Sequence, residues 1–202
     1  LGLAAETAWL AVGVQPATKG LDRTVRALAA RPEACLLVAG LSATDKAARD
    51  VVRLAERSGV AARVRWLGHR EDVPAVMAAA DLLVHPARLD TTGTVILEAV
   101  VNGLPVIAAG LCGYAEHVAA AEAGLVLPEP FDEKAFAAAL AAAADPIRRA
   151  AWSANGAAYG ARPDLYAGLE TAAELIVSTA AKAGALPARD CAEAQALARP
   201  VT

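Results

Sequence analysis

The chain has 202 residues, a hydrophobic fraction of 56%, an aromatic fraction of 4% and a formal net charge of −3. This length suits one substantial α/β domain, or one domain with a helical tail. The charge gives no general electrostatic reason to bind nucleic acid. No apolar run approaches the roughly 20 residues that a membrane span needs, so we expect a soluble chain.

Short apolar runs alternate with longer segments of helical periodicity. In chain order we expect a strand at 8–14, a helix at 22–30, a strand at 34–40, a helix at 44–59, a strand at 63–68, a helix at 72–81, a strand at 81–86, a helix ending near 102, a strand at 105–110, a short strand at 124–130, and helices at 132–144 and 147–159. Thr44 is a candidate N-cap, and Gly59 and Gly103 are expected to end their helices. The last forty residues predict a terminal helix with a frayed tail.

Strands that alternate with helices imply right-handed crossovers and a Rossmann-like, doubly wound parallel sheet. Such sheets bind ligands at the carboxyl ends of their strands, where loops lead into helices. The loops that follow positions 14, 40, 68, 85 and 109 are therefore the candidate sites.

Cysteine usage and the start of the chain bear on its origin. Cys35, Cys112 and Cys191 are widely spaced without a C-x-x-C pair, which favours reduced thiols in a cytoplasmic protein over a disulfide framework or zinc site. The sequence lacks an initiator methionine and a signal-type start. We therefore expect a piece of a longer protein.

Two loops carry single candidate cations. In "QPATKGLDR" (15–23), Lys19 stands beside Gly20 at a loop-to-helix junction, where a helix N-terminus and a cation together suit an anion. The loop matches neither a Walker motif nor G-x-G-x-x-G, so by itself it is more typical of a solvated lysine. Arg70 in "GHREDVP" (68–74) could stack on a base, but alone it is more typical of an exposed charge beside Glu71 and Asp72.

The run "HPARLDTTGTVILEAVVNGLPV" (85–106) is more specific. Asp90 and Glu98 lie on either side of Gly93, which stands at the expected helix start. Helical side chains tilt toward the N-terminus, so both carboxylates could accept hydrogen bonds from the hydroxyls of one sugar while the helix start faces phosphate. From spacing alone, an N-cap aspartate and a solvated glutamate are as well supported. "GLCGYAEHV" (110–118) could form a wall of the same cleft, with His117 structural rather than catalytic.

These motifs together resemble the donor site of retaining glycosyltransferases of family 4, which have the GT-B fold and an E-x7-E run followed by a helix and G-x-P-V. The likeness extends from about Trp9 to Tyr166. It includes "KGLDR" (19–23), "MAAADLLVHPA" (77–87), "CGY" (112–114), "EPF" (129–131) and "DLY" (164–166). Within the family, this order of motifs resembles that of the lipopolysaccharide core glucosyltransferase I group.

The resemblance implies that residues 1–163 form the nucleotide-sugar-binding Rossmann-like domain, the C-terminal half of a GT-B fold. Residues 164–202 would then form a C-terminal helix and tail, and the N-terminal acceptor domain would be absent from this chain. The full-length protein would be cytoplasmic, with peripheral contact at the inner membrane.

The resemblance also assigns roles to residues of this sequence. Glu98 would bind the ribose hydroxyls and Arg70 would lie near the uracil of UDP-glucose, while the backbone at Gly93 and Thr94 meets the phosphates. Asp90 would contact the donor sugar and Lys19 would neutralise the diphosphate. Both residues would act in catalysis, without a metal or other cofactor.

The implied reaction is hexosyl transfer to a lipopolysaccharide-core-type acceptor, and this chain alone would be inactive. Two departures from the family pattern stand out: Asp90 is one methylene shorter than the usual glutamate, and the first loop lacks a second cation except Arg23, a turn into the helix. A nucleotide-sugar 2-epimerase of the same fold and a flavodoxin-like, non-enzymatic binding module are the alternatives.

Overall fold

The computed structural model describes residues 7–182, and the chain separates into two compact units, Leu1–Ala161 and Arg162–Thr202. The larger unit contains a six-stranded sheet. Its strands are β1 (Thr7–Val12), β2 (Ala34–Ala39), β3 (Val64–Gly68), β4 (Leu82–His85), β5 (Val106–Ala109) and β6 (Gly124–Leu127). They lie in the order β3-β2-β1-β4-β5-β6, and every neighbouring pair is parallel. The predicted doubly wound sheet is confirmed.

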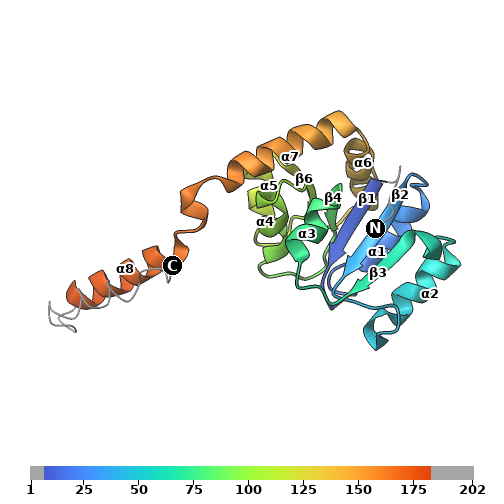
Figure 1. Cartoon of the computed structure of the whole chain (residues 1–202), viewed down its shortest axis with the longest axis horizontal. Helices are drawn as coiled ribbons and strands as arrows, with labels where there is room; N and C mark the ends of the chain where they lie inside the picture. The colour runs from blue at the N-terminus through green and yellow to red at the C-terminus, as the bar shows by residue number, and fades with distance from the viewer. Residues whose placement is uncertain (1–6, 183–202) are drawn as a thin grey trace. The chain divides into compact units, whose positions relative to one another are not determined.

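Helices cover both faces of this sheet (Figure 1). They are α1 (Leu21–Ala29), α2 (Arg49–Arg57), α3 (Val73–Ala78), α4 (Thr94–Val101), α5 (Ala115–Ala120), α6 (Glu133–Ala143) and α7 (Pro146–Gly160). Successive strand residues point to opposite faces, so Leu10 packs with α3, α4 and α5 while Trp9 packs with α1, α2 and α6. Burial on both faces explains why the strands are continuous apolar runs.

The strand order reverses between β1 and β4, because β1 pairs with β2 on one side and with β4 on the other. In doubly wound sheets this switch point opens a crevice outside the carboxyl ends of the strands, where ligands bind. The loops after β1 and β4 therefore form the candidate ligand-binding site.

The smaller unit contains, in its described part, a 3₁₀ turn (Pro163–Leu165) and α8 (Gly168–Lys182). The expected tail beyond this helix and Cys191 lie outside the described residues. Cys35 and Cys112 are buried thiols rather than a disulfide. Within residues 7–182, no helix combines the length and apolarity that crossing a bilayer would require.

The predicted start of the second helix was wrong. A 3₁₀ turn occupies Lys46–Ala48, and α2 begins only at Arg49, without a side-chain cap from Thr44. The Asp45 carboxylate instead accepts a hydrogen bond from the backbone N–H of Ser42 at 2.7 Å. Such local side-chain bonds stabilise a turn at the expense of the helix. The predicted helix ends are confirmed, since Gly59 and Gly103 follow α2 and α4 with φ of +67° and +69°.

An ion-pair network fixes the first turn of α1. Asp22 accepts two hydrogen bonds from Arg88, at 2.6 and 2.8 Å, and a third from Arg26 at 2.6 Å. Partial burial alone would raise the pKa of Asp22, but the bonds from Arg88 and Arg26 outweigh burial and lower it to about 2. The carboxylate is therefore ionised in the folded chain at pH values well above 2.

Asp22→Asn is expected to lower the free energy of unfolding at pH 7 by about 1 kcal/mol, because a partly exposed ion network is screened by solvent. Since the pKa is depressed, this contribution is present above about pH 4 and disappears as the pH falls toward 2. Urea unfolding of the two proteins between pH 7 and pH 2.5 measures the difference. Asp50→Asn, at an exposed position of α2, is the control with no ion pair among the described residues. A difference independent of pH would contradict the assignment.

Candidate functional site

Two loops meet at the switch point and are joined by hydrogen bonds. The backbone N–H groups of Arg88 and Leu89, after β4, donate to the Thr18 carbonyl, after β1, at 2.7 and 3.2 Å. The Arg23 guanidinium donates to the carbonyls of Pro86 and Ala87 at 2.9 and 3.1 Å. These bonds hold the loop that carries Lys19 against the loop that carries Asp90.

Gly20 permits this close approach. It caps α1 in the left-handed conformation, with φ of +70°, and a Cβ at this position would overlap the Pro86 carbonyl oxygen. A residue with a side chain would therefore push the two loops apart. The glycine in the "KGLDR" motif has a packing reason as well as a conformational one.

The two loops bring Lys19 and Asp90 together. Lys19 Nζ lies 2.6 Å from Asp90 Oδ2, across a sequence separation of 71 residues. His85, the last residue of β4, places its Nε2 2.7 Å from the same carboxylate oxygen. The Lys19 side chain keeps 28% of its surface exposed and Asp90 keeps 10%, whereas His85 is buried. The result is a cluster of one carboxylate and two nitrogen groups at the carboxyl ends of the central strands β1 and β4.

Burial and charge set the protonation states in this cluster. Burial lowers the pKa of His85 below its usual value, against the raising effect of Asp90, so the ring is neutral at pH 7. Partial burial would raise the pKa of Asp90, but hydrogen bonds from Lys19 and His85 outweigh it and lower that pKa. An ionised Asp90 can only accept hydrogen bonds, so the neutral ring carries its proton on Nε2 and donates it.

The first turn of α4 faces this cluster. Gly93 caps the helix in the left-handed conformation, and no described side chain supplies a cap hydrogen bond. A Cβ on Gly93 would lie 3.5 Å from Asp90 Oδ2, which places the carboxylate beside the helix start. Thr94 begins the helix and is exposed. A helix N-terminus without a side-chain cap offers N–H groups and partial positive charge to an anion.

Glu98 and Arg70 do not join the cluster. Glu98 lies exposed on α4, one turn beyond the helix start, and its carboxylate contacts none of the described side chains through a hydrogen bond or ion pair. Arg70 is exposed after β3, where its guanidinium makes a two-bond pair with Asp72 at 2.8 and 2.6 Å. The structure therefore brings together Lys19, Asp90 and the Gly93–Thr94 helix start, and leaves the other two predicted residues solvated.

One group of side chains in the described part of the chain could hold a metal ion. The ligand atoms of His85, Asp90 and Cys112 all lie within 4.8 Å of one another. A metal bound to Asp90 Oδ2 would have to displace the Lys19 ammonium and the His85 ring nitrogen, which already share that oxygen. It would also need the Cys112 thiolate, yet burial, with the Asp90 charge, raises the pKa of that thiol to about 11. Both observations favour Lys19 as the cation at this carboxylate.

The sequence interpretation missed two contributors. His85 was not predicted as a site residue, although a polar side chain that ends a buried strand is a signal of one. Arg23 was noted only as a cation one turn into the helix; its guanidinium donates to the Pro86 carbonyl in the loop after β4 and lies 3.7 Å from the centre of the Phe131 ring. His117 Nδ1 lies 2.9 Å from the Tyr159 hydroxyl, a contact that agrees with the structural role predicted for this residue.

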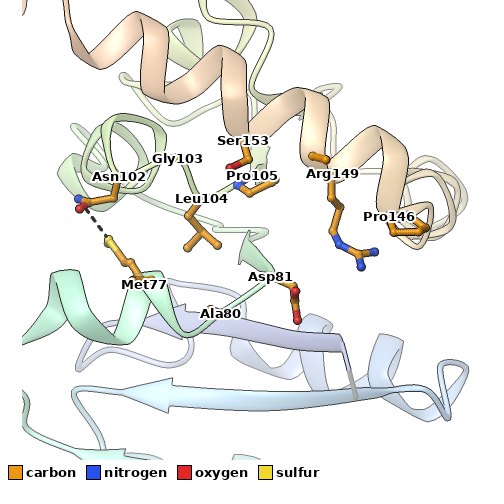
Figure 2. Close-up of a pocket in the computed structure, with 12 residues that line it drawn as sticks. Met77, Ala80, Asp81, Asn102, Gly103, Leu104, Pro105, Pro146, Arg149 and Ser153 are labelled. Atoms are coloured by element: carbon orange, nitrogen blue, oxygen red, sulfur yellow. Dashed lines mark hydrogen bonds between the residues drawn. The ribbon is translucent and has the colours of Figure 1, made fainter. Parts of the chain in front are cut away.

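A cavity of about 450 Å³ lies in the same unit, away from the cluster of Lys19, His85 and Asp90 (Figure 2). Its lining includes Asp81 and Pro105, which directly precede β4 and β5, so it opens at the amino ends of the strands rather than at the switch-point loops. Arg149 reaches it from α7, but this guanidinium donates to the carbonyls of Ala143 and Ala144 at the end of α6. The Arg149 guanidinium thus serves to terminate α6.

Comparison with known proteins matches this chain to a protein family. Residues 6–159 match the family model described as "Glycosyl transferases group 1". The lipopolysaccharide glucosyltransferase WaaG of Escherichia coli (strain K12) is 41% identical over 174 residues, which are 83% of this chain and 45% of that protein. The lipopolysaccharide core biosynthesis mannosyltransferase LpsB of Rhizobium meliloti (strain 1021) is 33% identical over 68% of this chain and 40% of its own length.

Solved structures agree with the sequence comparison. The crystal structure of WaaG superposes with a TM-score of 0.78 and 39% identity over 86% of this chain and 47% of that chain. Anabaena Alr3699/HepE in complex with UDP-glucose gives a TM-score of 0.69 and 26% identity over 79% of this chain and 45% of its own. The sheet with helices on both faces matches the GT-B fold of WaaG, as the sequence predicts. The chain spans less than half the length of these relatives. It belongs to the group 1 family of glycosyl transferases.

Proposed function

We propose that this chain is the donor-binding part of a retaining glycosyltransferase that uses UDP-glucose and transfers the hexose to a lipopolysaccharide-core-type acceptor. The observation that carries this proposal is the Lys19–Asp90 pair beside the first turn of α4 at the switch point of the sheet. The 41% identity to WaaG supports the acceptor class, and the UDP-glucose complex of HepE supports the donor.

Lys19 is proposed to bind the diphosphate together with the backbone of Gly93 and Thr94. A lysine ammonium has three protons, so the bond to Asp90 leaves two of them for phosphate oxygens. The uncapped helix start adds N–H donors and partial positive charge. Together they would neutralise the leaving diphosphate as a metal ion would, so the reaction is proposed to need no divalent metal.

The remaining contacts with the donor are proposed from the family resemblance. Asp90 is proposed to accept a hydrogen bond from a hydroxyl of the donor sugar, and exposed Glu98 to accept two from the ribose. Arg70 keeps the planar faces of its guanidinium available for the uracil, because Asp72 occupies only one edge. The departing phosphate would help to deprotonate the acceptor hydroxyl, so no side chain of this chain is assigned as a nucleophile.

The rest of the protein would complete the site. An N-terminal domain is proposed to bind the acceptor and close the cleft, so the 202-residue chain should bind UDP but transfer little sugar. The cytoplasmic location and the peripheral contact with the inner membrane stay predictions.

Calorimetric titration of the folded 202-residue chain with UDP, UDP-glucose and ADP-glucose tests the proposal. Binding of UDP and UDP-glucose, with weaker binding of ADP-glucose, is the expected result. Circular dichroism on the same sample establishes that the chain is folded. Absence of binding for all three nucleotides would overturn the proposed function.

Glu98→Ala is expected to weaken UDP binding by on the order of 1.5–3 kcal/mol, because two hydrogen bonds to a charged acceptor are lost. This corresponds to roughly ten- to a hundredfold in the dissociation constant. Glu56→Ala is the matched control, since Glu56 is also an exposed helical glutamate, on α2. Equal affinities of the parent and Glu98→Ala for UDP, measured by calorimetry, would contradict the ribose role.

A further inference from the structure

We propose that His85 is a positioning residue for the donor sugar: it holds the Asp90 carboxylate so that Oδ1 alone is left to accept a sugar hydroxyl. This inference rests on the proposed role of Asp90 at the donor sugar. His85 itself would not contact the sugar, because its side chain is 2% exposed while that of Asp90 is 10% exposed.

Both donors of the cluster bind the same oxygen. Lys19 Nζ lies 2.6 Å and His85 Nε2 lies 2.7 Å from Asp90 Oδ2, and no described residue donates to Oδ1. Two donors that arrive from different elements prevent the carboxylate from rotating about its Cβ–Cγ bond. The direction in which Oδ1 presents its lone pairs is therefore set by the protein before any ligand binds.

The fixed point of this arrangement is the His85 ring. It ends β4 and is buried, so the strand and the core hold its orientation. Lys19 has four rotatable side-chain bonds and is partly exposed, so it can turn toward a phosphate while His85 stays. The start of α4 lies beside the same oxygen, since a Cβ added at Gly93 would come within 3.5 Å of Asp90 Oδ2.

The protonation state matters to this role. A neutral ring that donates from Nε2 orients the carboxylate without adding a second full positive charge. Asp90 thus keeps the acceptor strength of an ionised carboxylate for a neutral hydroxyl donor. The short aspartate has two side-chain torsions, and His85 and Lys19 together restrict both.

The test measures, by calorimetry on the full 202-residue chain, the ratio of the UDP-glucose to the UDP association constant. His85→Asn and His85→Gln both place an amide in the same buried space, but only glutamine carries its nitrogen about as far as the imidazole Nε2. Asp90→Ala is the benchmark for complete loss of the sugar contact. We expect Asp90→Ala and His85→Asn each to lower the ratio by about tenfold. His85→Gln should stay within about threefold of the parent, and UDP affinity should change by less than about threefold in both His85 variants.

The outcomes separate the two proposals. No UDP binding by the parent chain, or an unchanged ratio in Asp90→Ala, would overturn the sugar role of Asp90 and this inference together. A lowered ratio in Asp90→Ala with an unchanged ratio in His85→Asn would overturn the positioning role alone. Equal loss in His85→Asn and His85→Gln would do the same, because it would indicate a general packing effect.

A second measurement needs no substitution at His85. The chain contains three histidines, so the imidazole ¹H–¹⁵N NMR signals can be assigned individually. We expect a neutral His85 with its proton on Nε2, and a shift of that signal in Asp90→Ala. UDP-glucose should move it further than UDP does, because a hydroxyl on Oδ1 weakens the bond at Oδ2. A signal indifferent to Asp90→Ala and to the sugar would overturn the inference even if His85→Asn fails to fold.

Discussion

Gly20→Ala is expected to lower the free energy of unfolding by about 2–5 kcal/mol. Two costs add: a non-glycine residue in the left-handed region costs about 1–2 kcal/mol, and overpacking against a fixed neighbour costs about another 1–3 kcal/mol. The fixed neighbour is the Pro86 carbonyl, which a Cβ on Gly20 would overlap. Because Arg23 also bonds to this carbonyl, at 2.9 Å, it cannot move aside without losing that bond.

Gly59→Ala is the matched control. Gly59 has φ of +67°, close to the +70° of Gly20, but nothing lies within 4 Å of the position that its Cβ would occupy. This substitution should therefore cost only the backbone strain, about 1–2 kcal/mol. Denaturant unfolding of both variants measures the difference, and equal costs would contradict the close approach of the two loops.

Lys19→Met is expected to weaken UDP binding by about 2.5–4 kcal/mol, on the order of a hundredfold or more. Removing the ammonium deletes charge-assisted bonds to the phosphates, worth on the order of 1.5–3 kcal/mol. It also leaves the Asp90 carboxylate without its cation beside the incoming diphosphate, and like charges near 4 Å repel by about 1 kcal/mol even in water. Methionine keeps the apolar length of the side chain, so packing changes little.

Lys46→Met is the control for Lys19→Met. Lys46 is exposed in the turn before α2, and no ion pair involves it among the described residues. Its replacement should leave the dissociation constant for UDP unchanged within about twofold, since surface charges at a distance are screened. Calorimetry at fixed ionic strength compares the three proteins. A Lys19→Met protein that binds UDP as tightly as the parent would contradict the diphosphate role.

The residues at the crevice show how local and tertiary information differ. The pattern around Gly93 is local: a glycine before an apolar helical run predicts a helix start, and α4 begins at Thr94. The pairing of Lys19 with Asp90 is not local, because 71 residues separate them. The sequence pattern predicts that Lys19 and Asp90 lie in loops at the carboxyl ends of the strands. It does not show that their side chains form a hydrogen bond with each other.

Arg70 illustrates the opposite case. From sequence it could face a base or solvent, and its partner in the structure is the neighbouring Asp72, two residues away. Such a pair depends on the rotamers of two exposed side chains, which periodicity does not determine. The prediction of the α2 start was wrong for a related reason. The Asp45 carboxylate accepts a hydrogen bond from the Ser42 backbone and stabilises a turn where helical periodicity predicts the first turn of a helix.

The sequence by itself determined the fold class. Buried apolar runs that alternate with helical segments are compatible with few topologies, because crossovers between parallel strands are right-handed. In such sheets ligands bind at the carboxyl ends of the strands, which is where the candidate site lies. Tertiary structure alone decided which polar groups meet there. The order β3-β2-β1-β4-β5-β6 sets β1 beside β4, and the bonds of Arg23 and Arg88 then bring their loops into contact. That contact gives the Asp90 carboxylate its cation, which lies 71 residues away along the chain, because an interaction of this kind depends on distance in space and not on spacing along the chain.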